Sequence, residues 1–87
     1  MKYVMLKRDH CGMEQHVPII FPTMLSHSDV ADAMKNVPEL KDAQVHSAGE
    51  ISPMDMVATG KSITLQVEAD EDDTQRIMMI DYYHGLR

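Results

Sequence analysis

Three residues near the N-terminus carry side chains that could do chemistry together. His10, Cys11 and His16 lie in one polar stretch, where two imidazoles and a thiolate could bind a metal ion or Cys11 could act as a nucleophile. Zinc sites usually show tighter spacing, such as C-x2-C or H-x3-H, with a second pair elsewhere in the chain. Neither pattern occurs here. A small metal-binding or enzymatic protein using this loop is therefore kept as an alternative hypothesis.

Two other motifs resemble parts of active sites. Gly60-Lys61-Ser62 matches the end of a phosphate-binding loop, but that motif needs a glycine where Asp55 stands and a helix afterwards. His27-Ser28-Asp29 holds the residue types of a hydrolase triad, yet adjacent side chains at a helix start cannot converge in the required relay. We predict no catalytic residues, no cofactor and no metal site, and therefore a protein that is not an enzyme.

An acidic stretch near the C-terminus is the densest charge cluster in the chain. It places five carboxylates in six positions and directly precedes a helical pattern, where acidic residues complement the helix dipole. An alternative function is an acidic inhibitor of a host nucleic-acid-binding complex. In that function the carboxylates of this chain would imitate the phosphates of the nucleic acid. The residues concerned are Glu68, Asp70, Glu71, Asp72 and Asp73.

Composition limits the remaining possibilities. The 87 residues carry a net charge of −6, and positions 45–87 hold three Lys/Arg against eight Asp/Glu, which argues against nucleic-acid binding. The single cysteine precludes an internal disulfide, and no apolar run is long enough for a membrane helix or a signal peptide. We expect a cytoplasmic protein of a bacterial host that binds neither nucleic acid nor membrane.

The N-terminal half predicts two strands and a helix. We expect strands at 2–7 and 17–21, joined by a polar turn over 8–15. The helix face is formed by Val30, Ala33, Met34 and Val37, with Ser26 and Asp29 as a capping box and an end near Asn36 before Pro38.

The C-terminal half predicts three more strands and a second helix. We expect strands at 42–48, 55–59 and 62–68, the last two joined by a tight turn at Gly60-Lys61. In the strand 62–68, Ile63, Leu65 and Val67 alternate with polar residues and should face the core.

The final helix is predicted over 74–84, with Asp70 as its N-cap. Ile77, Ile80 and His84 share one side of it, whereas Met78, Met79 and Tyr82 occupy much of the other. The second group either enters the protein's own core or meets a partner. We predict an interaction surface formed by Met78, Met79 and Tyr82 together with Glu68, Asp70, Glu71, Asp72 and Asp73.

These elements give a fold-class prediction. The order β-β-α-β-β-β-α indicates one α+β domain over residues 1–87. The simplest arrangement is a two-layer sandwich, in which an antiparallel sheet of about five strands carries both helices on one face.

The chain also resembles a group of small phage- and prophage-encoded proteins without an assigned activity. The resemblance implies a viral or mobile-element origin and supplies no catalytic residues. The chain departs from the group's pattern at Glu50, where an apolar residue is expected. The matching segments are Phe21-Pro22, Leu25-Ser26-His27, Asp29-Val30-Ala31, Ser47-Ala48-Gly49, Gly60-Lys61-Ser62, Ile63–Val67 and Asp70–Asp73.

Together these features predict a non-enzymatic protein–protein interaction protein of phage type. A chain this short builds only a small core, so association with a second copy is expected to contribute to its stability. Its nine methionines suit surfaces that adapt to a partner. We therefore expect a homodimer or a complex with another protein.

Overall fold

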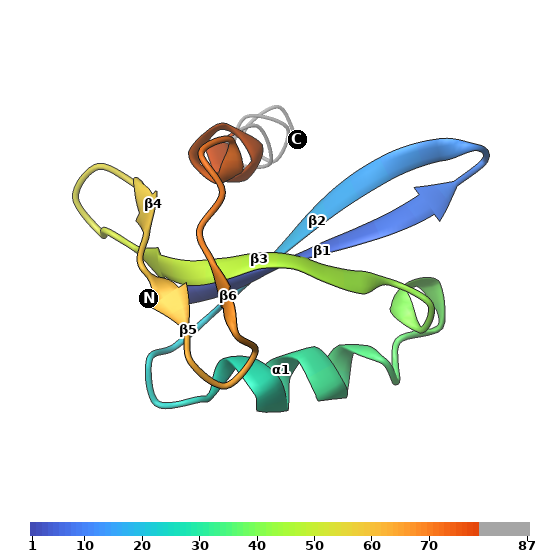
Figure 1. The fold of residues 1–87 in the computed structure, drawn as a ribbon, viewed down its shortest axis with the longest axis horizontal. Coiled ribbons are helices and arrows are strands. Elements are labelled where there is room, and N and C mark those ends of the chain that lie inside the picture. The colour runs from blue at the N-terminus through green and yellow to red at the C-terminus, as the bar shows by residue number, and fades with distance from the viewer. Residues whose placement is uncertain (79–87) are drawn as a thin grey trace, which may run out of the picture.

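A four-stranded antiparallel sheet in the order β2-β1-β3-β4 forms the centre of the protein in a computed structural model that describes residues 1–78 (Figure 1). A separate pair, β5 and β6, packs beside β3. Within the described residues, no helix is long and apolar enough to cross a membrane. The elements are β1 (Lys2–His10), β2 (Met13–Phe21), α1 (His27–Met34), the 3-10 helix η1 (Pro38–Leu40), β3 (Gln44–Ile51), β4 (Ala58–Thr59), β5 (Lys61–Ser62), β6 (Val67–Glu68) and a helical segment at 73–78.

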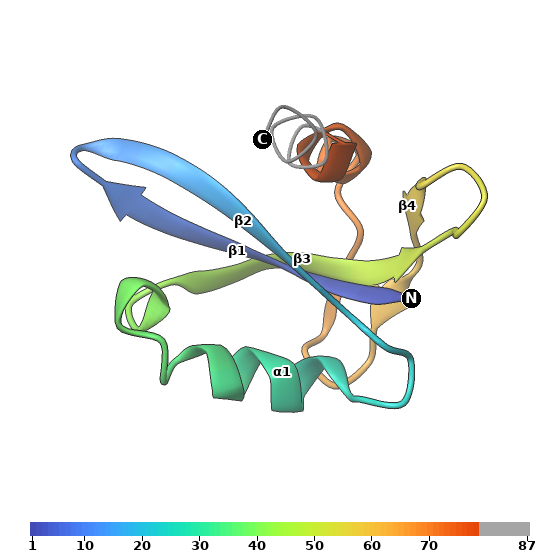
Figure 2. The same ribbon diagram turned by 180° about the vertical axis from the view of Figure 1, so that it is seen from behind.

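The prediction of an α+β fold is confirmed, but the helices do not share one face of the sheet. Figures 1 and 2 show α1 and the helical segment 73–78 on opposite sides. Val4 and Leu6 of β1 pack in a core with α1, whereas Tyr3 and Met5 pack in a second core with Ile77. Consecutive apolar residues in β1 supply both faces, so the strand is buried on each side. The two-layer prediction is therefore wrong.

The first two strands form a much longer hairpin than predicted. They pair from Lys2↔Phe21 to His10↔Met13, and the turn consists of Cys11 (φ 55°) and Gly12 (φ 80°). Most of the polar residues in the predicted turn 8–15 belong to the two strands instead. They continue the β1–β2 pairing beyond the hydrophobic core. An ion pair between Lys7 and Glu14 (3.3 Å) and a hydrogen bond from Arg8 Nε to Gln15 Oε1 (2.9 Å) connect the two strands there.

Helix α1 begins where the sequence predicted. Ser26 is the N-cap, and its hydroxyl accepts a hydrogen bond from the Asp29 backbone N–H at 3.1 Å. Val30 is buried as expected, but Ala33 is exposed, and His27 is buried instead. His27 Nε2 lies 2.9 Å from the backbone carbonyl oxygen of Gly49, which fixes the start of the helix to β3.

Strand β3 is shifted toward the C-terminus relative to the predicted strand 42–48. A β-bulge lies where the register with β1 changes between Met5↔Ser47 and Leu6↔Val45, so His46 is the extra residue. Gly49 lies inside the strand. A Cβ atom there would overlap the carbonyl oxygen of Thr59, and glycine lets β4 approach closely.

The predicted hairpin with a turn at Gly60-Lys61 is not formed. Gly60 (φ 83°) links β4 to β5, and the tight turn lies four residues further on, between Ser62 and Val67. The Ser62 hydroxyl accepts a hydrogen bond from the Leu65 backbone N–H (3.2 Å), which stabilises this turn. As a result Ile63 is 82% exposed and Ser62 is buried, the reverse of the predicted alternation.

Candidate functional site

The predicted interaction residues do not form one exposed surface. Met78 is 52% exposed, and Met79 and Tyr82 lie outside the described residues. Glu68, Glu71 and Asp72 are exposed and Asp70 is half-buried, whereas Asp73 is fully buried. The assignment of Asp73 to an exposed acidic surface is therefore wrong, because its carboxylate is turned into the protein.

Asp73 lies at the centre of a polar cluster between the sheet and the helical segment 73–78. Its Oδ2 accepts hydrogen bonds from the Tyr3 hydroxyl and the Ser47 hydroxyl, both at 2.6 Å, and from the Asp70 backbone N–H at 3.0 Å. Its Oδ1 accepts one from Arg76 Nη1 at 3.1 Å. This partner set satisfies a buried charge, which would otherwise be strongly unfavourable.

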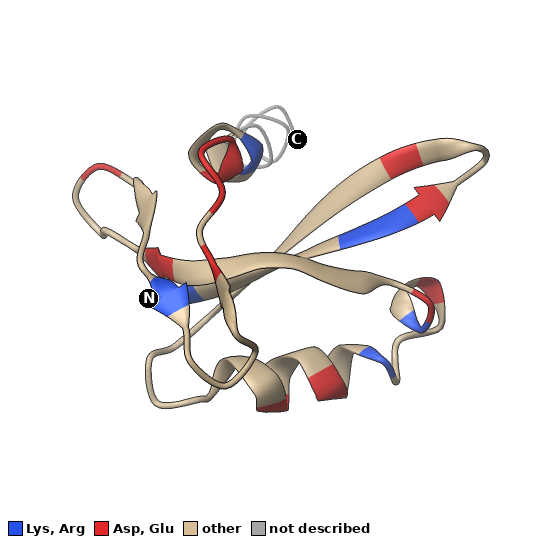
Figure 3. Cartoon of the chain, viewed as in Figure 1, with Lys and Arg blue, Asp and Glu red and all other residues tan. Residues whose placement is uncertain are grey.

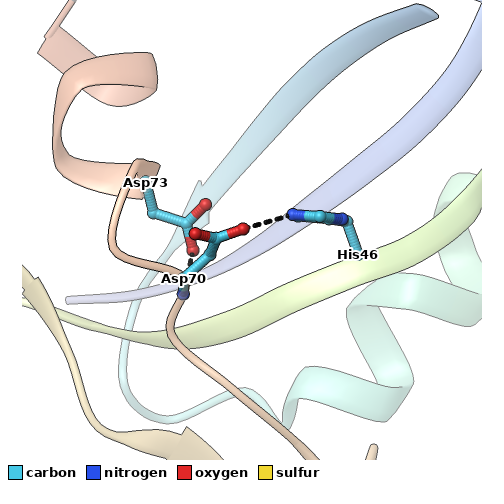
Figure 4. A group of neighbouring side chains, drawn as sticks. All are labelled: His46, Asp70 and Asp73. Atoms are coloured by element: carbon cyan, nitrogen blue, oxygen red, sulfur yellow. Dashed lines mark hydrogen bonds and ion pairs between the residues drawn. The ribbon is translucent and has the colours of Figure 1, made fainter.

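Asp70 provides the second carboxylate of the cluster. The Asp72 backbone N–H donates to Asp70 Oδ1 at 3.1 Å, so Asp70 and Asp73 cap the helix reciprocally. The predicted N-cap role of Asp70 is confirmed. His46 Nε2 donates to Asp70 Oδ2 at 2.6 Å (Figure 4). The bonds from Asp72 and His46 lower the pKa of the Asp70 carboxyl to about 2.

Two aromatic side chains of the sheet take part in the same cluster. Burial and the hydrogen bond to Asp73 raise the pKa of the Tyr3 phenol far above its usual value, so it remains a donor. His16 from β2 packs edge-on against His46, with ring centroids 4.9 Å apart. Burial, together with the nearby charge of Arg76 and with His46, lowers the pKa of His16.

The cluster has the ligand types of a metal centre but is already occupied by a protein cation. His46, Asp70 and Asp73 each offer one ligand atom, and these atoms lie within 4.8 Å of one another (Figure 4). However, Arg76 Nη1 lies 3.3 Å from Asp70 Oδ2 and 3.1 Å from Asp73 Oδ1. The guanidinium supplies the positive charge that a metal ion would bring. The geometry fits an ion-pair network that fastens the helical segment to the sheet.

A groove of about 720 Å³ opens beside this cluster, between β3 and the β5–β6 hairpin. The His46 imidazole, oriented by Asp70, and the Lys61 amine both line it. The remaining lining mixes polar and apolar side chains: Ser47, Ser62, Ile63, Gln66, Val67, Glu68, Ala69 and Asp70.

The structure does not bring His10, Cys11 and His16 into one site. His10 pairs with Met13 at the hairpin turn, and His16 pairs with Lys7 three positions further along. Because strand side chains alternate, His10 and His16 point to opposite faces of the hairpin, about 10 Å apart along it. Cys11 is exposed at the turn. His16 belongs to the polar cluster instead.

Most residues of the polar cluster were not identified from the sequence. Tyr3, the adjacent pair His46 and Ser47, and Arg76 are separated by long stretches of chain and match no motif. Only the pair of aspartates, spaced three apart at a helix start, carried a readable signal of the capping box. No family model, curated protein or solved structure matches this chain. What the cluster does therefore has to follow from its own geometry.

Proposed function

We propose that this chain is a non-enzymatic protein–protein interaction protein that works as a homodimer. The observation that supports this most strongly is the set of large apolar side chains left outside both cores. Met24, Met54 and Ile63 are 87%, 95% and 82% exposed. Burying such side chains contributes about 25 cal/mol per Å² of apolar surface, which favours association.

The polar cluster supports a non-enzymatic role. Its most buried carboxylate, Asp73, accepts hydrogen bonds from four groups of the protein itself. Arg76 bridges Asp73 and Asp70, and Asp70 also holds His46. These bonds stabilise the fold and occupy the groups that would otherwise bind a substrate or a metal ion.

The phage type and the cytosol of a bacterial host remain part of this proposal. The short matching segments of the sequence support the former, and the exposed free thiol of Cys11 is compatible with a reducing compartment. The alternative of an acidic inhibitor is less well supported, because Asp70 and Asp73 are engaged by Arg76 inside the fold.

Sedimentation equilibrium tests the homodimer. We expect the mass of two chains at concentrations on the order of tens of micromolar, where a weak but specific interface is populated. The mass of one chain throughout that range would contradict the proposal.

A further inference from the structure

Several of the most exposed apolar residues lie toward one end of the molecule. Figures 1 and 2 show the N-terminus, the segment between β2 and α1 and the segment between β3 and β4 at the end opposite the β1–β2 turn. The contacts agree: Lys2 Nζ donates to the Leu25 carbonyl oxygen at 3.1 Å, and the Ile51 backbone N–H donates to the Met1 carbonyl oxygen at 2.8 Å. We call this the loop-end surface, with the exposed residues Met24, Leu25, Met54 and Ile63.

We propose that the loop-end surface is the interface through which a second copy of this chain binds. This inference rests on the proposed homodimer and specifies which surface forms it. Met24, Met54 and Ile63 are each more than four-fifths exposed and are held by different segments of backbone. Methionine packs adaptably, which suits a surface that meets its own copy across a two-fold axis.

The charges at this end are compatible with binding a second copy of the chain. A cavity of about 240 Å³ is lined there by Lys2, Lys61 and Glu50, next to Ile63. With Asp55 in the neighbouring loop, this end carries charges of both signs, as the mixed colours in Figure 3 show. In a two-fold dimer the same surface supplies both sides, so balanced charges can be matched with opposite ones.

The negative charge of the molecule, −6 in total, is concentrated elsewhere. The stretch 68–73 alone holds five carboxylates, only partly offset by Arg76. Two copies joined through that surface would bring like charges together, which costs free energy. The charges around the β1–β2 turn also balance, but that end presents Met13 where the loop-end surface presents four exposed apolar side chains. The loop-end surface therefore combines charges of both signs with the larger set of exposed apolar side chains.

Sedimentation equilibrium of charged variants tests the surface. Met24→Glu combined with Ile63→Glu places two new carboxylates on each side of the proposed interface. We expect the dimer dissociation constant to rise by about 100-fold or more, the loss expected when central contacts of an interface are removed. Met13→Glu is the matched control: Met13 is 73% exposed beside the β1–β2 turn, at the other end of the molecule. It should leave the dissociation constant within about threefold of the wild type.

The outcomes separate the two proposals. A wild-type monomer would overturn the homodimer itself. A wild-type dimer that persists in the double variant, or that dissociates equally in Met13→Glu, would leave the homodimer standing and overturn the loop-end surface. Circular dichroism checks that the double variant folds. If it does not fold, Met54→Glu is measured in its place, since that side chain is 95% exposed and has little role in the fold. A dissociation constant that does not rise above that of Met13→Glu would then overturn the loop-end surface.

Discussion

At the scale of single residues, His16 illustrates how neighbouring groups set the behaviour of a side chain. One alternative hypothesis from the sequence made it a metal ligand together with His10 and Cys11, although no metal site was predicted. In the structure it lies against His46, and burial, Arg76 and His46 lower its pKa. The folded protein therefore favours the neutral imidazole.

This pKa shift predicts a pH dependence of stability. The unfolded chain binds a proton at His16 near pH 6.5, whereas the folded protein binds it only at lower pH. The free energy of unfolding should therefore decrease as the pH falls from about 7 through the lowered pKa. Urea unfolding at about pH 7 and pH 5.5 measures this loss, and His16→Gln should reduce it. If the variant lost the same amount of unfolding free energy between these pH values, the pH dependence could not be attributed to His16.

At the scale of secondary structure elements, Asp73 joins the helical segment 73–78 to the sheet. Tyr3 from β1 and Ser47 from β3 both donate to it, so one carboxylate connects three elements. The capping-box bond with Asp70 fixes the start of the helical turn at the same time.

Asp73→Asn should therefore destabilise the protein although the side chain keeps its size. The amide removes the charge that pairs with Arg76 and offers an N–H₂ group where donors already point. We expect the free energy of unfolding, measured in urea, to fall by about 2–4 kcal/mol. Asp72→Asn is the control, since that side chain is 64% exposed and should change the value by at most about 0.5 kcal/mol. Equal effects of both substitutions would show that the buried hydrogen bonds of Asp73 do not account for the loss of stability.

At the scale of the whole molecule, the protein has two cores on either side of one sheet. Met5 faces the core that contains Ile77, and Leu6 faces the core that contains Val30 and Leu40. A sheet covered on one face only would leave one of these two positions tolerant of substitution.

Met5→Ala and Leu6→Ala should both be strongly destabilising. We expect losses of about 2–5 kcal/mol for each in chemical unfolding, because both side chains are almost fully buried. Ile20→Ala in the edge strand β2, where the side chain is 37% exposed, serves as a control with a smaller loss. A tolerant Met5→Ala would argue that the second core contributes little to stability.

Local signals were enough to predict several features from the sequence. Ser26 starts α1 and Asp70 caps the last helical segment, because capping depends on residues only two or three positions apart. The α+β class and the pairing of the first two strands also follow from the periodicity of side chains along the chain.

The tertiary structure decided what depends on distant residues. The alternation of Ile63, Leu65 and Val67 predicted a core strand, but the Ser62 hydroxyl stabilises a turn in that stretch. The apolar run in β1 is compatible with burial on one face or both, and only packing places a helix on each side. The polar cluster likewise joins residues up to 70 positions apart, a juxtaposition that no local pattern encodes. The sequence by itself determined where helices begin; the fold determined which side chains meet, because that depends on the three-dimensional path of the chain.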